Sequence, residues 1–459
     1  MMEEVILAET QSICPKCLTA IPAIRVAMGD RVHLRKTCPE HGRFEAVIWR
    51  GHPACSSWVR SKIPAYPKKA STLVEKGCPL DCGLCAEHRQ QTCTALIEVT
   101  RRCDLQCTFC FADAGSNSVA DPALEDFKEQ FERLFDSAGP CNVQLSGGEP
   151  TLRDDLPEIV SMGRLRGFPF IQINTNGLRL AKDSCYVETL KEAGLASVFL
   201  QFDGMDDRVY RKLRGRELLR EKLLAIEQCA GSGIGVVLVP TLVPGVNTDQ
   251  IGAIIEFALK ELPAVRGVHF QPVSYFGRYP SAPTDEDRIT IPEIITKIET
   301  QTHGRIRVEH FKPPGCENAL CSFHGNFVLL TDGSLTAWTH YKAEDCCCKP
   351  IHAAEGAAKA RRFVTQFWSN PNGGRLFSVR TEAPSLGAWD DFLSRARTHS
   401  LCVSGMAFQD AWTLDLERLK DCCIHVVQSD GRLIPFCAYN VTGSEGLSYY
   451  RKAPAEGET

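Results

Sequence analysis

The sequence predicts an α/β fold, a partial (βα)6 barrel of the TIM type, with cysteine-rich metal-binding extensions before and after it. Six apolar, strand-like runs alternate with helix-like stretches between residues 95 and 275. Such alternation is typical of a parallel sheet covered by helices, and its buried strands are nearly continuous in apolar residues. Six units fall short of a complete eight-unit barrel. The chain also holds 23 cysteines, and they are grouped.

The expected elements of the barrel follow in chain order. The strands are ALIEVT, NVQLSG, PFIQINTN, SVFLQFDG, GVVLVPTLV and GVHFQPV, which begin at residues 95, 142, 169, 197, 235 and 267. The helices are expected at 122–137, 154–167, 182–194, 216–233 and 248–262. We divide the chain into a ribbon module at 1–60, a cysteine segment at 61–94, the barrel at 95–275 and an extension at 276–459.

The first 60 residues predict a small rubredoxin-like or ribbon module. CPKC at 14–17 and CPEHG at 38–42 are two knuckles with metal-ligand spacing. The segment between them predicts a hairpin with its turn at Gly29–Asp30. One Fe or Zn ion is expected here, with Cys55 as an alternative to the histidine. The ligand set is Cys14, Cys17, Cys38 and His41.

Length and charge exclude some classes of protein. A chain of 459 residues can bury a large core without disulfides, and its net charge of −4 argues against a generally basic nucleic-acid binder. The start MMEEVILAETQ lacks the features of a signal peptide, and no apolar run is long enough to span a membrane. We expect a cytoplasmic protein without a nucleic-acid partner or transmembrane segment; peripheral membrane contact stays open.

The loop after the first barrel strand reads RRCDLQCTFCFADAG and supplies three cysteines without a nearby fourth: Cys103, Cys107 and Cys110. Three thiolates can hold three irons of a [4Fe–4S] cluster and leave the fourth iron for a small molecule. The alternative is a closed metal site with a distant fourth ligand. Because active groups of such barrels lie at the carboxyl ends of the strands, the position favours an open cluster. This arrangement resembles the radical S-adenosylmethionine (SAM) superfamily.

The next strand ends in SGGEP, where paired glycines allow close backbone approach and a glutamate can accept hydrogen bonds from an ammonium group. In the resembled superfamily this motif holds the amino group of SAM; its residues here are Gly147, Gly148, Glu149 and Pro150. The third and fourth strands end in polar side chains suited to ribose hydroxyls or substrate, with loop capping as the alternative. These are Asn174, Asn176, Gln201 and Asp203.

Further cysteines predict one or two auxiliary clusters. Cys78, Cys82, Cys85 and Cys93 form a four-ligand set for a [4Fe–4S] cluster or zinc. Late in the chain, GCENALC and CCIHVVQSDGRLIPFC supply two pairs that could meet across the fold, with Cys346–Cys348 as competing ligands.

The order of these motifs over nearly the whole chain resembles the multi-cluster radical SAM proteins that include the archaeal tetraether lipid synthase, some of which are assigned as pterin methyltransferases. The resemblance implies a radical SAM cluster at 103–110, an auxiliary cluster at 78–93, and another held by Cys316, Cys321, Cys423 and Cys437. It also implies the N-terminal metal site.

The resemblance predicts an enzyme that uses a 5′-deoxyadenosyl radical to remove hydrogen from an unactivated C–H bond. Its most specific form is sp³ C–C coupling of lipid chains. The alternatives are methylation of a pterin or other small molecule, peptide modification by an auxiliary-cluster maturase, and a zinc-rich binding scaffold. The expected partners are SAM, a lipid or small-molecule substrate, and reduced ferredoxin or flavodoxin as electron donor.

Overall fold

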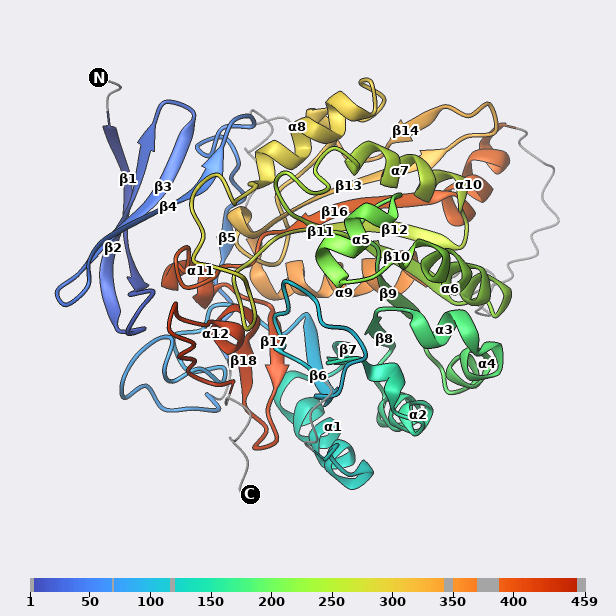
Figure 1. Ribbon diagram of the computed structural model, residues 1–459, viewed down its shortest axis with the longest axis horizontal. Coiled ribbons are helices and arrows are strands. Elements are labelled where there is room, and N and C mark those ends of the chain that lie inside the picture. The colour runs from blue at the N-terminus through green and yellow to red at the C-terminus, as the bar shows by residue number, and fades with distance from the viewer. Residues whose placement is uncertain (1–3, 68–69, 116–119, 342–349, 370–387, 452–459) are drawn as a thin grey trace.

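The computed structural model describes residues 4–67, 70–115, 120–341, 350–369 and 388–451. The competing ligands Cys346–Cys348 lie outside the described residues. Figure 1 shows a curved central sheet with helices on its outer side and a small separate sheet at the N-terminal end of the chain.

The six predicted barrel strands are confirmed as neighbours in the central sheet. They run parallel in the order β12-β10-β9-β8-β7-β6. Their bounds are β6 (Thr94–Thr100), β7 (Asn142–Gly147), β8 (Phe170–Thr175), β9 (Ser197–Gln201), β10 (Gly235–Val239) and β12 (Val265–Pro272); the short β11 (Thr241–Leu242) also pairs with β12. The predicted partial barrel is therefore the core of the fold.

The extension after residue 275 adds strands to both edges of this sheet, which the sequence analysis did not predict. β16 (Ser400–Met406) pairs in parallel with β12, and β17 (Ile424–Val427) pairs in parallel with β6. Antiparallel strands then flank them: β13 (Ser322–Leu329) and β14 (Leu335–Ala337) beyond β16, and β18 (Leu433–Pro435) beyond β17. Within the described chain the sheet stays open between β18 and β14.

All five predicted barrel helices are present: α1 (Leu124–Ala138), α2 (Leu156–Arg166), α4 (Ser184–Glu192), α6 (Leu219–Gly231) and α7 (Ile251–Lys260). Two short helices, α3 (Leu178–Lys182) and α5 (Asp207–Arg214), accompany them. In α1 the buried Phe127, Phe131 and Leu134 recur at helical spacing, so one face packs on the sheet. The later helices are α8 (Ile291–Gln301), α9 (Ala353–Phe367), α10 (Ala388–Thr398), α11 (Leu416–Lys420) and α12 (Phe436–Asn440).

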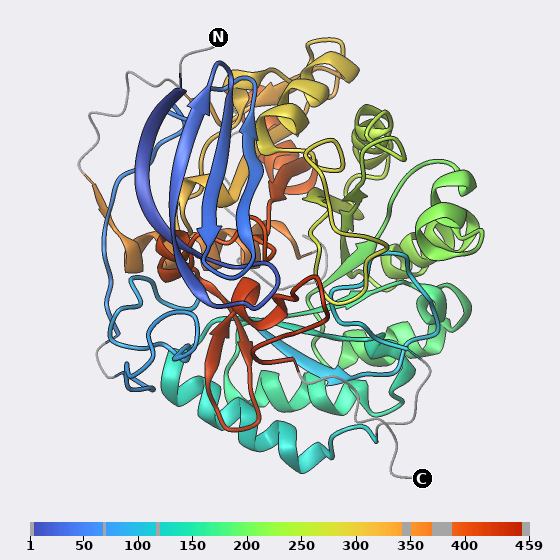
Figure 2. The same ribbon diagram turned by 60° about the vertical axis from the view of Figure 1, so that its left-hand side comes forward.

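The N-terminal module is a four-stranded antiparallel sheet, β1 (Glu4–Ile13), β2 (Ala20–Met28), β3 (Arg31–Cys38) and β4 (Gly42–Arg50). The predicted turn at Gly29–Asp30 is confirmed, because Met28 pairs with Arg31 across it. Figure 2 shows this sheet in front of the later part of the chain. The buried Lys36 connects the N-terminal module to the later part of the chain, because its Nζ donates a hydrogen bond to Ala411 O at 2.8 Å.

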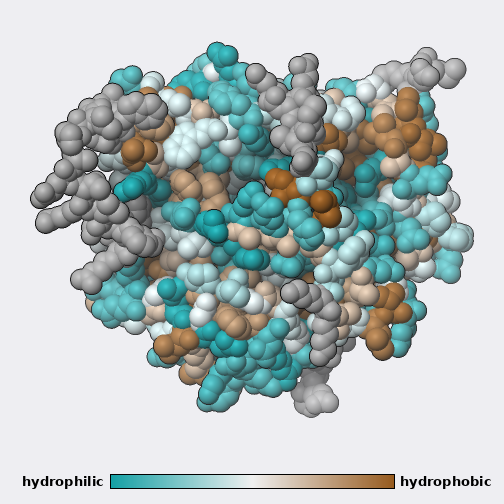
Figure 3. Space-filling model, turned by 180° about the vertical axis from the view of Figure 1, so that it is seen from behind, coloured by the Kyte–Doolittle hydropathy of each residue, from teal (hydrophilic) through white to brown (hydrophobic). Residues whose placement is uncertain are grey.

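Hydrophobic side chains on the face seen in Figure 3 form separate patches among hydrophilic ones. Among the described helices, none is both long and apolar enough to cross a bilayer.

Candidate active site

A cavity of about 600 Å³ occupies the inside of the curved sheet. Its wall is built by inward-facing side chains of β6, β7, β8, β9, β12, β13 and β16, and by α9. The cysteine loop that follows β6 lines it at the carboxyl ends of the strands, where active groups of such barrels lie. The other end reaches Cys93, Cys316 and Cys423.

The loop with Cys103, Cys107 and Cys110 is held by backbone hydrogen bonds at both ends. Cys103 N donates to Gly115 O at 3.0 Å, and Cys110 exchanges two 3.0 Å bonds with Arg278. Burial raises the pKa of the Cys103 thiol to about 12. The three sulfurs are not gathered within 4.8 Å of one another. Three thiols on one short loop at the carboxyl end of β6 are the donor set that the predicted cluster needs for three of its irons.

The paired glycines admit the cysteine loop to the end of β7. A Cβ on Gly148 would lie 2.1 Å from Arg102 O, and one on Gly147 would lie 2.2 Å from Thr100 O. The predicted close approach is therefore present, but it is between two backbone segments of the chain. Pro150 begins the short helical turn Pro150–Leu152 that follows.

Glu149 is 2% exposed and links the ends of β7 and β8. One carboxylate oxygen accepts from Thr151 Oγ1 and Thr175 Oγ1, both at 2.6 Å, and the other accepts from Asn176 N at 2.6 Å. Burial raises the pKa of this carboxyl group, while these hydrogen bonds act to lower it. Glu149 thus holds the ends of β7 and β8 together. Its predicted contact with the SAM amine stays a prediction.

The polar residues at the rim divide into two kinds. Asn176 organises the loops, because its Nδ2 donates to Asp104 Oδ1 at 2.7 Å and its Oδ1 accepts from Leu178 N at 2.9 Å. Asn174 and Gln201 line the cavity. Asp203 is fully buried and, with Pro150, is not among the described residues that line it.

Asp203 instead binds Arg214, a site residue that the sequence analysis missed. Arg214 Nε and Nη2 donate to the two carboxylate oxygens at 2.8 and 2.7 Å. Burial acts to lower the pKa of Arg214, but the charges of Asp203 and Cys107 raise it above its ordinary value. The guanidinium lines the cavity and carries a positive charge beside the cysteine loop. In the sequence, nothing distinguishes Arg214 from the other basic residues at the end of α5.

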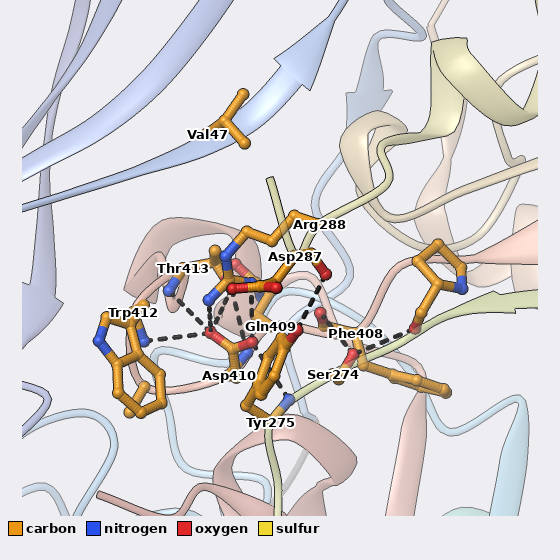
Figure 4. A network of polar contacts seen from close by, with 12 residues as sticks. Val47, Ser274, Tyr275, Asp287, Arg288, Phe408, Gln409, Asp410, Trp412 and Thr413 are labelled. Atoms are coloured by element: carbon orange, nitrogen blue, oxygen red, sulfur yellow. Dashed lines mark hydrogen bonds and ion pairs between the residues drawn. The ribbon is translucent and has the colours of Figure 1, made fainter. Parts of the chain in front are cut away.

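A second buried network holds the wall of the cavity near β12 (Figure 4). Asp410 is fully buried and accepts from Arg288 Nη1 at 2.9 Å, from Tyr275 N at 3.2 Å and from Trp412 N at 3.1 Å. Ser274 Oγ donates to Phe408 O at 3.2 Å. Both Ser274 and Phe408 line the cavity, so the network fixes this part of its wall.

The four predicted ligands of the N-terminal module lie together, with all four ligand atoms within 4.8 Å of one another. Cys17 Sγ and Cys38 Sγ are 4.0 Å apart, and His41 Nδ1 is 3.5 Å from Cys38 Sγ and 3.7 Å from Cys14 Sγ. The histidine occupies the fourth position, and Cys55 is not in the set. Two knuckles that present ligands to one tetrahedral ion explain this spacing.

The remaining cysteines are grouped differently from the prediction. Cys78, Cys82 and Cys85 line a small cavity of about 20 Å³ without Cys93. Cys93 instead lies with Cys316 and Cys423, all within 4.8 Å. The chain brings them together because Cys93 N and Thr94 N both donate to Cys423 O, at 2.8 and 3.1 Å.

Cys321 and Cys437 lie outside that set. Cys321 Sγ accepts from Arg418 Nη2 at 3.4 Å, and Cys437 Sγ accepts from Gln409 N at 3.3 Å. Burial raises the pKa of Cys437 to about 12, and the neighbouring Cys321 contributes to the shift. The predicted four-cysteine set of Cys316, Cys321, Cys423 and Cys437 is thus divided between two places.

The interior of the cavity carries buried amides without protein partners. Both polar atoms of Asn142 and of Gln172, and the Oδ1 of Asn174, make no hydrogen bond with the described chain. Asn142 and Gln172 are each 1% exposed. Because buried polar groups are normally paired, these amides need polar partners, which ordered water or a polar ligand can supply. Aromatic rings lie near them, with Phe199 and Trp368 5.0 Å apart at their centroids.

Two family models match the chain. Residues 97–258 match the model described as "Radical SAM superfamily", and residues 6–50 match "HMPTM N-terminal zinc ribbon domain". The first range holds the cysteine loop and the SGGEP motif, and the second holds the Cys₃His set.

Among curated proteins, the chain is similar to "7,8-dihydro-6-hydroxymethylpterin dimethyltransferase" of Methanocaldococcus jannaschii, with 36% identity over 98% of this chain and 96% of that protein. It is also 30% identical to "Probable GTP 3',8-cyclase" of Archaeoglobus fulgidus, over 52% of this chain and 83% of that protein. Among solved structures, Streptococcus suis SuiB bound to S-adenosylmethionine matches with a TM-score of 0.35, 19% identity and 44% of each chain covered.

Proposed function

Because the chain belongs to the radical SAM family that includes 7,8-dihydro-6-hydroxymethylpterin dimethyltransferase, we propose that it is a radical SAM methyltransferase for a pterin or a similarly polar fused heterocycle. Family membership makes the chain a radical SAM enzyme with a [4Fe–4S] cluster and SAM as cofactors. The substrate and the methyl transfer are the proposed part.

The unpartnered amides in the cavity carry the proposal. A pterin ring has a lactam N–H and C=O beside an amidine edge, which together offer donors and acceptors in one plane. Asn142 on β7 and Gln172 on the neighbouring strand β8 each offer an amide NH₂ donor and a carbonyl acceptor. These groups complement the acceptors and donors of the pterin edge. The rings of Phe199 and Trp368 supply faces on which a flat heterocycle packs.

Lipid coupling, the most specific activity predicted from the sequence, fits this cavity less well. A hydrocarbon chain would cover the amides of Asn142 and Gln172 and offer them no hydrogen bond. Each buried polar group left unpaired costs about 1–3 kcal/mol. The relative that matches over nearly the whole chain also carries a pterin in its name. Pterin methylation, given above as an alternative, is therefore the better supported activity.

Each site residue has a separate role in this proposal. Cys103, Cys107 and Cys110 hold the cluster, and the end of β7 with Asn174 and Gln201 forms the wall against which SAM lies. When bound, cluster and SAM supply a radical able to remove hydrogen from an unactivated carbon. Asp203 positions Arg214, and the guanidinium balances the negative charge of the cysteine loop.

Product mass tests the proposal. The anaerobically reconstituted enzyme is reduced and incubated with 7,8-dihydro-6-hydroxymethylpterin and SAM that carries a deuterated methyl group. The expected result is a pterin product that contains added one-carbon units. An unchanged pterin, together with a lipid product that has lost two hydrogens, contradicts the proposal and restores lipid coupling. The matched control is enzyme in which Cys103, Cys107 and Cys110 are all replaced by alanine.

A further inference from the structure

Three cavity-lining side chains that the proposed function leaves unused lie in one row across neighbouring strands: His269 on β12, Ser404 on β16 and His324 on β13. His269 pairs with Ser404 in the parallel register of β12 and β16, and Ser404 pairs with His324 in the antiparallel register of β16 and β13. Figure 1 shows these three strands side by side. Two imidazoles and a hydroxyl therefore line one wall of the cavity.

His269 is the imidazole of this row whose orientation the structure fixes. Its Nδ1 lies 2.9 Å from Ser404 Oγ, at hydrogen-bond distance. Its ring stacks on Phe199, with centroids 5.6 Å apart and planes at 28°, and meets the ring of Trp368 edge-on at 6.3 Å. The second ring nitrogen, Nε2, makes no hydrogen bond with the described chain. The imidazole is thus anchored through Nδ1 and leaves Nε2 for a ligand in the cavity.

The wall around His269 is polar but uncharged. Burial lowers the pKa of His269 and the pKa of His324 to about 4 each, so both imidazoles are neutral near pH 7. In the described parts of β12, β13 and β16, no residue that lines the cavity is a lysine, an arginine, an aspartate or a glutamate. A neutral imidazole offers one donor and one acceptor and has no net charge with which to hold an anion. The wall therefore suits an uncharged polar group.

A hydroxyl group is the best complement for the free nitrogen of His269. Ser404 Oγ can donate to Nδ1 or accept from it, so Nε2 carries a lone pair in one tautomer and a proton in the other. A hydroxyl group both donates and accepts, so it pairs with either tautomer. A carbonyl group pairs with only one of them, and a methyl group with neither. The hydroxymethyl group in the name of the similar dimethyltransferase supplies such a hydroxyl.

His269 lies closer to the carboxyl ends of the strands than the amide of Gln172 does. The register of β12, β10 and β9 places His269 level with Gln201, the last residue of β9. Gln172 on β8 pairs with Ser197, the first residue of β9, which is about 13 Å lower along the strand. A heterocycle whose polar edge contacts Gln172 therefore has its opposite edge toward the level of His269.

We propose that His269 Nε2 hydrogen-bonds to an uncharged hydroxyl group on the substrate, and that Ser404 is the positioning residue for this imidazole. The inference rests on the proposed function and adds to it the contact that selects a hydroxyalkyl substituent. The hydrogen bond holds the carbon that carries the hydroxyl near the carboxyl end of the sheet, while the amides hold the far edge of the ring. The contact transfers no proton and no electron.

Equilibrium binding of two pterins to the anaerobically reconstituted full-length protein, with SAM present, tests the contact. The ligands are 7,8-dihydro-6-hydroxymethylpterin and 7,8-dihydro-6-methylpterin, which lacks the hydroxyl. The wild type should bind the hydroxymethyl compound roughly 10-fold more tightly. His269→Gln keeps an amide near the position of Nε2 and should keep this preference. His269→Asn keeps only the position of Nδ1 and should lose it, so a preference retained by His269→Asn overturns the contact.

A second comparison tests the positioning role of Ser404. Ser404→Ala releases Nδ1 and should lower the preference at least about threefold, whereas Ser404→Thr keeps a hydroxyl and should retain the preference. If His324→Leu removes the preference and His269→Asn does not, the assigned imidazole is wrong.

The wild type alone separates this contact from the proposed function. A wild type that binds both pterins equally overturns the contact and leaves the proposed function standing. A wild type that binds neither pterin overturns the proposed function, and the contact with it. Because this comparison needs no substitution, the contact is tested even where a variant does not fold.

Discussion

The two ends of the cavity hold cysteine triads of opposite design. At the carboxyl end of β6, Cys103, Cys107 and Cys110 come from one short loop, and their sulfurs are spread. At its amino end, Cys93, Cys316 and Cys423 come from three distant segments and are gathered within 4.8 Å. The seven residues of β6 separate the two ends by about 20 Å. One loop thus supplies the first triad by itself, whereas the second is assembled by the fold from distant segments.

The comparison teaches that sequence spacing and metal geometry carry different information. A compact motif indicates a shared site, but only the fold shows which distant cysteines lie together. Amides without hydrogen-bond partners in the described chain extend from Asn142, beside Cys93, toward Gln172 and Asn174 on β8, and in the proposed function they contact the substrate.

The largest effect is expected at the spread triad. Replacing Cys103, Cys107 and Cys110 together with alanine removes every thiolate that holds the cluster, so formation of 5′-deoxyadenosine from SAM should fall to background. Chromatography of the products after reduction measures it. The N-terminal Cys₃His site should keep its metal ion. Undiminished cleavage of SAM would show that the radical cluster lies elsewhere.

Two glycines offer a matched pair of smaller changes, one at each end. A Cβ on Gly148 meets Arg102 O at 2.1 Å, and a Cβ on Gly356 meets Gly315 O at the same distance. Gly148→Ala should therefore lower cluster iron and sulfide by more than half. Gly356→Ala should instead displace the loop with Cys316 and leave most of the cleavage of SAM intact. Identical changes in both variants would mean that the two ends are not independent.

The buried ion pair of Arg214 and Asp203 should matter for stability. Arg214→Met leaves Asp203 as an unpaired buried carboxylate, which costs about 3–5 kcal/mol in the free energy of unfolding. Urea unfolding followed by circular dichroism measures the change. The control is Arg208→Met, because the pair between Arg208 and Asp206 is exposed and worth about 0–1 kcal/mol. Equal losses in both variants would contradict the account.

Lys222 predicts a pH dependence. Burial lowers its pKa to about 8, so the folded chain binds this proton less tightly than the unfolded chain. Its contribution to stability is therefore present above the ordinary lysine pKa and is lost as pH falls toward 8. Relative to Lys222→Met, the wild type should gain about 3 kcal/mol between pH 8 and 10.5. The exposed Lys128→Met serves as reference, and a flat difference would refute the prediction.

A modest effect is expected for the amides of the cavity. Gln172→Leu removes a hydrogen-bonding group of about 1–3 kcal/mol, so the KM for the pterin should rise roughly 10- to 100-fold. Initial rates at several pterin concentrations measure it. Uncoupled cleavage of SAM should persist, because the cluster is untouched. The exposed Gln366→Leu should change neither quantity. A KM unaltered by Gln172→Leu would place the substrate elsewhere.

The barrel core could be predicted from the sequence, but its completion could not. The six strands are long apolar runs separated by amphipathic stretches, which is a strong periodic signal. Two later strands are short and are not flanked by alternating strand-like and helix-like segments: SLCVSGM at 400–406 and IHVV at 424–427. Their places beside β12 and β6 follow from tertiary packing alone.

The site was predicted where ligands are close in sequence. The triad at 103–110 and the knuckles of the ribbon are local motifs that spacing alone predicts, and the structure gathers the four knuckle ligands. Cys93 was assigned to its nearest cysteines in the sequence, although the fold carries it to Cys316 and Cys423. Arg214 gave no local signal, because a single charged residue beside a motif is usually solvated. Only the folded chain shows that it is buried.

The most direct test of the account is anaerobic equilibrium binding in the presence of SAM, with 7,8-dihydro-6-hydroxymethylpterin as ligand. The double variant Asn142→Leu with Gln172→Leu removes both unpartnered amides and keeps the size of the cavity similar. The account predicts saturable binding of the pterin by the wild type and binding at least 100-fold weaker by the double variant. Equal affinity of the two proteins for the pterin would contradict the claim that these amides hydrogen-bond to the substrate.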